Sequence, residues 1–149
     1  MKFKFPFEHV LKFRKENENL ARLDYVDTLD KLETEKGVLK KMHVDWKSSL
    51  EEISDLQQSH SAPLARILYL NDFMTGLKVK INSQRKVVQN FQSITEQKFE
   101  VMLGAIKEYE IINKLKEKQF ERFKKDVSKR ELKNNDEIVV TRYQRKEAI

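Results

Sequence analysis

The scarcity of turn-forming residues constrains the fold of this chain more than any other feature. Its 149 residues include three glycines and two prolines. A globule built from many short elements needs frequent turns, and turns are made largely of Gly, Pro, Asn and Asp. Charged residues make up 36% of the chain, above the roughly 25% of an average globular domain. Both features predict a few long helices.

The chain contains no cysteine, which excludes a disulfide framework and a thiolate metal site. Its first residues lack an apolar run of signal-peptide length, and no stretch approaches the roughly 18 apolar residues of a membrane span. We therefore expect the protein to reside in the cytoplasm.

One segment interrupts the helical pattern. Residues 57–63 are small or polar and end in Pro63, which disfavours helix at the residue before it. We place the chain reversal there. The expected organisation is a single coiled-coil domain over 1–149, with a helix at 6–57, a turn at 58–63, a helix from 64 to about 134, and a tail at 135–149 that is either ordered or disordered.

The second helix carries the most regular hydrophobic pattern. From Ile67 to Ile112, core positions recur in alternating steps of three and four residues, and three of them are clearly polar: Gln84, Thr95 and Lys98. This spacing is typical of a coiled-coil seam.

The first helix is less regular in its first half. We predict an apolar stripe there whose three-residue steps drift around the helix: Val10, Phe13, Leu20, Leu23, Val26, Leu29 and Leu32. Farther on, the heptad becomes regular, with Leu39, Trp46 and Ile53 at a positions and Met42 and Leu56 at d positions.

Together these patterns predict an all-α fold, a long antiparallel two-helix coiled-coil hairpin with a projecting C-terminal helix. The net charge of +6 is uneven, because residues 1–15 carry five basic and one acidic side chain and residues 114–149 carry twelve and seven. Residues 16–113 are therefore net −3. A hairpin brings both basic segments to the same end, where the projecting helix would expose Phe120 and Phe123.

The sequence offers no catalytic constellation. His9, His43 and His60 have no histidine or cysteine partner at metal-binding spacing. The glycines are far apart and form no phosphate-binding loop. A two-stranded coiled coil also lacks the desolvated pocket that catalysis requires. We expect no enzymatic activity, no metal and no cofactor.

Both ends of the chain resemble a known family. The opening, Phe-Lys-Phe-Pro-Phe-Glu-His-Val-Leu-Lys-Phe-Arg from Phe3 to Arg14, and the closing stretch from Lys129 to Glu137 followed by Arg142 and Arg145 are similar to those of the FliJ family of flagellar type III export proteins. The hairpin proportions also resemble that family. The resemblance implies binding to the hexameric export ATPase FliI, to the cytoplasmic region of the export gate FlhA and to export chaperones. It also implies membrane association through these partners alone, and no nucleic acid.

The resemblance also implies two binding sites. The ATPase-binding end would comprise Lys2, Lys4, Arg14, Phe120, Arg122, Phe123, Lys125, Arg130 and Arg142. The export-gate-binding patch would comprise Leu39, Trp46, Leu50, Phe73 and Leu77.

Two other functions agree with the same sequence. An equivalent stalk protein of a virulence type III injectisome would look nearly the same. A basic helical hairpin could instead bind nucleic acid or the ribosome, although the acidic residues interleaved with the C-terminal cations favour ion pairs along the helix. Binding to phosphates would weaken steeply as salt is raised.

Overall fold

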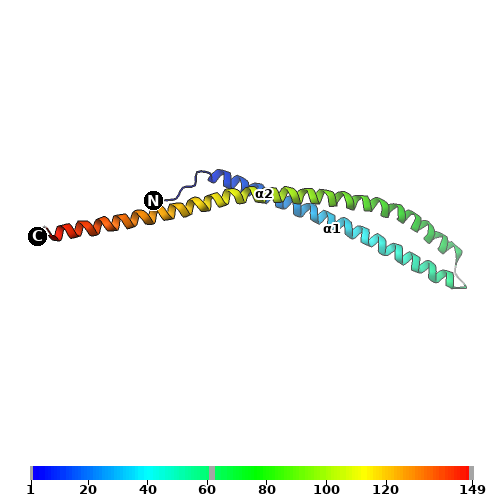
Figure 1. Ribbon diagram of the computed structural model, residues 1–149. Helices are drawn as coiled ribbons and strands as arrows, with labels where there is room; N and C mark the ends of the chain where they lie inside the picture. The colour runs from blue at the N-terminus through cyan, green and yellow to red at the C-terminus, as the bar shows by residue number, and fades with distance from the viewer. Residues whose placement is uncertain (1, 61–62, 148–149) are drawn as a thin grey trace. The chain divides into compact units, whose positions relative to one another are not determined.

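A computed structural model describes residues 2–60 and 63–147, which form two long helices (Figure 1). α1 spans Glu8–Gln58 and α2 spans Leu64–Glu147. The two helices pack against each other, which confirms the predicted all-α hairpin. No helix in the described part of the chain has a stretch long and apolar enough to cross a bilayer.

The ends of the helices follow local sequence signals. α1 begins just after Pro6, and the Leu11 amide donates to the Phe7 carbonyl at 3.0 Å. Glu8 lies in the first turn of α1, where a carboxylate complements the helix dipole. At the chain reversal, the Arg66 amide donates to the Pro63 carbonyl at 3.1 Å, which starts α2. Two residues of the expected turn, Ser61 and Ala62, lie outside the described residues.

α2 continues to Glu147, whereas the sequence led us to expect an end at about residue 134. No glycine or proline occurs after Gly104, so nothing in the sequence stops the helix. Arg145 and Lys146 lie in its last turn, where cations complement the helix dipole.

The chain divides into two compact units, and both helices contribute to each. Unit 1 comprises Met1–Asn19 and Gly104–Ile149, and unit 2 comprises Leu20–Leu103. Unit 1 carries 18 basic and 12 acidic residues, whereas unit 2 carries 12 of each. The net positive charge of the chain therefore belongs to unit 1. That the two units form a single domain stays a prediction.

The seam predicted along α2 is confirmed. Every expected core position from Ile67 to Ile112 is buried or half-buried, and the three polar members, Gln84, Thr95 and Lys98, are among them. The alternating three- and four-residue steps keep one face of α2 turned towards α1.

The stripe predicted along the first half of α1 is wrong at five positions. Val10, Phe13, Leu20, Leu23 and Val26 are between 37% and 66% exposed. Each three-residue step turns the helix face by about 60°, because an α-helix has 3.6 residues per turn. The stripe thus rotates away from α2. The residues that face α2 instead continue the regular heptad backwards: Glu35, Leu32, Thr28, Tyr25, Ala21, Glu18, Arg14 and Leu11.

Polar side chains in the seam are satisfied by hydrogen bonds. The Gln84 side-chain amide donates to the Glu35 carbonyl at 3.1 Å and also to the Glu35 carboxylate. Thr28 and Thr95 donate to carbonyls one turn earlier in their own helices, each at 2.7 Å. Among the described residues, no buried side-chain nitrogen or oxygen lacks a hydrogen-bond partner. The seam therefore holds polar residues without leaving them unpaired.

The apolar core of unit 2 is densest near the chain reversal. Ile53, Leu70 and Met74 form a buried cluster, and Trp46 and Leu56 pack against it. This cluster fixes the pairing of α1 and α2 near the turn.

Candidate protein-binding surfaces

An aromatic clamp joins the N-terminal segment to α2 within unit 1. It consists of Phe3 and Phe5 on the segment before α1, and Lys116, Phe120 and Phe123 on α2. The Phe3 ring centroid lies 5.2 Å from that of Phe120 and 5.6 Å from that of Phe123. Such aromatic pairs contribute roughly 0.5–1.5 kcal/mol each beyond the area they bury. The clamp thus holds the segment before α1 against α2.

Lys116 connects the clamp to the start of α1. Its ammonium lies 2.9 Å from the Glu8 carboxylate and 6.0 Å from the centroid of the Phe5 ring. Phe5 is 6% exposed, the most buried aromatic residue of the described chain. Lys116 therefore contacts both a carboxylate and an aromatic face at the point where α1 begins.

The nine residues expected at the ATPase-binding end all belong to unit 1, but their environments differ. Phe120 and Phe123 contact Phe3 of the segment before α1, so they do not lie on a bare helix as expected, although Phe120 stays 39% exposed. Arg14 is half-buried and forms an ion pair with Glu108 of α2. The remaining cations are exposed: Lys2, Lys4, Arg122, Lys125, Arg130 and Arg142.

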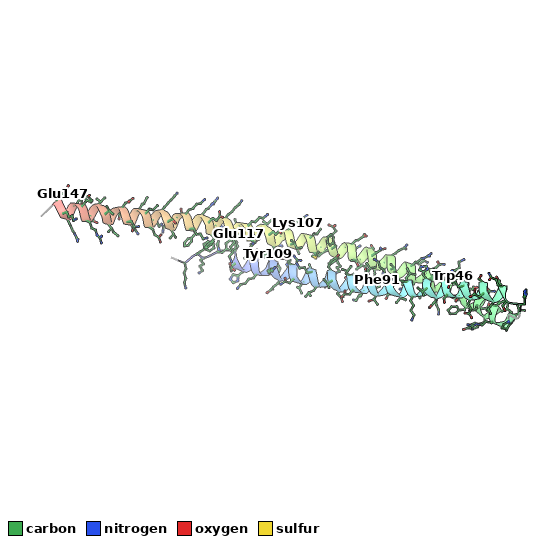
Figure 2. All side chains as sticks on the ribbon, turned by 90° about the horizontal axis from the view of Figure 1, so that it is seen from below. Trp46, Phe91, Lys107, Tyr109, Glu117 and Glu147 are labelled. Carbon is green, nitrogen blue, oxygen red and sulfur yellow. The ribbon has the colours of Figure 1, made fainter. Side chains whose placement is uncertain are left out.

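The last part of α2 has no helix beside it within unit 1. Every described residue from 128 to 147 is exposed, and in Figure 2 side chains surround the helix towards Glu147. Leu132, Val139 and Tyr143 are more than half exposed. This segment exposes both cations and apolar side chains.

A second cluster of predicted residues, the export-gate patch, lies in unit 2. Leu39, Trp46 and Leu77 face the seam, and Trp46 packs against the cluster near the turn (Figure 2). Leu50 and Phe73 are 48% and 42% exposed. Leu50 follows a seam residue of α1, whereas Phe73 precedes one of α2, which places them on opposite flanks of an antiparallel pair.

The lining of a groove confirms that Phe73 and Leu50 lie on opposite flanks. It has a volume of about 350 Å³, and Phe73 lines it together with Tyr69, Arg66 and Glu52, but not Leu50. The five predicted residues therefore share one stretch of unit 2 but do not form one continuous surface.

The chain matches the family model described as Flagellar FliJ protein over residues 3–148, which is nearly its full length. The chain belongs to the FliJ family. No curated protein and no solved structure matches it. Membership makes the chain a flagellar export-related protein of the type III secretion class.

Sequence reasoning missed part of this FliJ family member's clamp. It assigned Phe120 and Phe123 to a partner, but it did not place Phe5 and Lys116 in contact with each other. The available signal was the cluster of Phe3, Phe5 and Phe7 ahead of the first helix, because apolar rings close together favour burial against a partner. Phe3 and Phe5 contact α2, whereas Phe7 is 47% exposed.

Proposed function

We propose that this protein is a non-catalytic adaptor of the flagellar export apparatus that binds the hexameric export ATPase FliI through unit 1. It promotes assembly and activity of the ATPase and links it to the export gate FlhA and to export chaperones. The observation that carries the proposal is the net positive charge of unit 1, whose surface also exposes Phe7, Phe13, Phe120 and Tyr143. Membership of the FliJ family supports the assignment to the flagellar export apparatus. The protein would act in the cytoplasm and reach the inner membrane through its partners alone.

The exposed end of α2 should be needed for stimulation of the ATPase. A chain ending at Val127 keeps Phe3, Phe5, Lys116, Phe120 and Phe123, but it loses Arg130 and Arg142. We expect it to lose most of the increase in ATP hydrolysis, because charge-assisted contacts to a partner are the stronger class of polar contact. Steady-state hydrolysis by the purified ATPase, with and without each form of the protein, measures this.

The matched control for this truncation is the full-length Lys41→Glu, Lys80→Glu variant, which alters charge in unit 2 alone. It should stimulate hydrolysis like the wild type. Full stimulation by the shortened chain would exclude the end of α2 from the ATPase site.

For the gate contact, we propose the patch of Leu39, Trp46, Leu50, Phe73 and Leu77, with Phe73 as its most accessible aromatic residue. Phe73→Ala should weaken binding to the cytoplasmic region of FlhA by about tenfold, the effect of losing an aromatic anchor at an interface. Isothermal titration calorimetry measures the affinity.

Leu50→Ala, on the opposite flank, tests which part of the patch makes the contact. If only Phe73→Ala weakens binding, the gate contacts the Phe73 flank. Unchanged affinity in both variants would remove the exposed members from the site.

A further inference from the structure

One flank of unit 2 includes a stretch that carries cations and no acidic residue, bounded by Glu33 and Glu96 on the same flank. With Leu39 and Trp46 at a positions of α1 and Met74 and Ile81 at a positions of α2, the e and b positions lie on one side of the seam. Over residues 36–50 and 71–92, that side carries no Asp or Glu. We call its cationic and histidine residues the basic flank: Lys36, Lys40, His43, Lys47, Lys78 and Arg85.

The other flank of the same stretch is mixed in charge. Its g and c positions carry Lys41 and Lys80, but also Asp45, and Glu52 follows on the same flank just beyond the stretch. The basic character therefore belongs to one side of the helix pair rather than to the whole stretch.

Most cations of the basic flank have no counter-ion among the described residues. Lys36 lies 3.5 Å from Glu33, but Lys40, Lys47, Lys78 and Arg85 form no ion pair with any residue that the structure describes. Elsewhere in unit 2, Arg66 pairs with Glu52 at 2.8 Å and Lys31 with Asp27 at 3.0 Å. Clustered like charges repel one another, so a flank that keeps them unpaired is suited to an anionic partner.

The basic flank surrounds a groove between the two helices. Its volume is about 250 Å³, and it is lined by His43, Trp46, Lys78, Ile81, Asn82 and Arg85. Trp46 and Ile81 supply apolar surface, and Lys78 and Arg85 lie at its rim on exposed helix positions. An apolar floor with a cationic rim suits an apolar side chain flanked by carboxylates.

We propose that this groove binds an acidic segment of a partner protein. An apolar side chain of that segment enters the groove, while its Asp and Glu residues pair with Lys78 and Arg85. Trp46 lines the groove and also packs against the buried cluster of Ile53, Leu70 and Met74, and no Phe or Tyr of the described chain lines the groove beside it. Single-stranded nucleic acid is instead bound by stacking successive bases on aromatic side chains. The groove lies in unit 2, on the flank opposite Phe73, and shares Trp46 with the proposed export-gate patch.

The proposal is tested with a short fluorescent peptide of Asp and Glu residues around one central Leu. Fluorescence anisotropy on the full-length protein should detect binding. Lys78→Glu with Arg85→Glu should lower the affinity by about tenfold or more, because each reversal replaces an attraction with a repulsion. Replacing the central Leu of the peptide by Ala should also weaken binding, since the groove would lose its apolar occupant.

The matched control, Lys41→Glu with Lys80→Glu, changes the net charge equally on the opposite flank. It should alter the affinity by less than about twofold. Circular dichroism checks that both variants keep their helices, and Lys78→Gln with Arg85→Gln serves if the reversal disturbs folding. Absence of peptide binding, equal losses in both variants, or tighter binding of an RNA oligonucleotide than of the peptide would overturn the proposal.

Discussion

Leu70→Ala should lower the free energy of unfolding by about 2–5 kcal/mol, the range for removing a buried leucine side chain. Leu70 is 3% exposed and belongs to the cluster with Ile53 and Met74 near the chain reversal. In unit 2, a two-helix pair provides no third layer that could move in to fill the space. The loss would appear as a lower urea midpoint, followed by far-ultraviolet circular dichroism.

Leu68→Ala is the matched control, because Leu68 lies on the same turn of α2 and is 55% exposed. The two variants change helix propensity equally, so the difference between them reports burial alone. Leu68→Ala should stay within about 0.5 kcal/mol of the wild type. Similar losses in the two variants would mean that the cluster near the turn does not hold the helices together.

The seam of α2 could be predicted from the sequence because its apolar residues satisfy the heptad almost without exception. The seam of α1 could be predicted from Leu39 onward but not before it. The earlier part places Arg14, Glu18 and Glu35 at core positions and leaves Leu20 and Leu23 outside. In this part of α1, the most hydrophobic face of the helix is therefore not the face that packs against α2. Counting the heptad backwards from Leu39 would have found the right one, because the geometry of pairing, rather than composition, sets which face turns to the partner helix.

The surfaces differ in how far the sequence could predict them. Counting charges along the sequence grouped the two basic terminal segments, and the structure assigns both to unit 1. Net charge can be counted without coordinates. The clamp lies outside the heptads, so no periodicity links Phe3 or Phe5 to α2. The basic flank could have been read from the register of Trp46 and Ile81, but only once the antiparallel pairing of e positions was known.

The clamp leads to the second large effect, which concerns Phe5. Phe5→Ala should detach the N-terminal segment from α2, because the substitution removes a ring that is 6% exposed and faces Lys116. Burial of a phenylalanine side chain typically contributes about 3–5 kcal/mol. Without it, the first turn of α1, including the Leu11 amide that bonds to Phe7, should open more often. Hydrogen exchange followed by mass spectrometry should show protection falling by about 100-fold at the start of α1. Where the wild-type protection is smaller than this, it should be lost entirely.

Phe13→Ala provides the comparison, since Phe13 lies on α1 at 58% exposure. It should leave exchange at the start of α1 nearly unchanged. Protection retained in Phe5→Ala would show that Glu8 and Lys116, 2.9 Å apart, hold the segment without the ring. That outcome would shift the origin of the clamp from aromatic burial to an ion pair, and its stability would then fall as salt is raised. A clamp held by aromatic burial would instead persist in salt, so exchange at high ionic strength distinguishes the two origins.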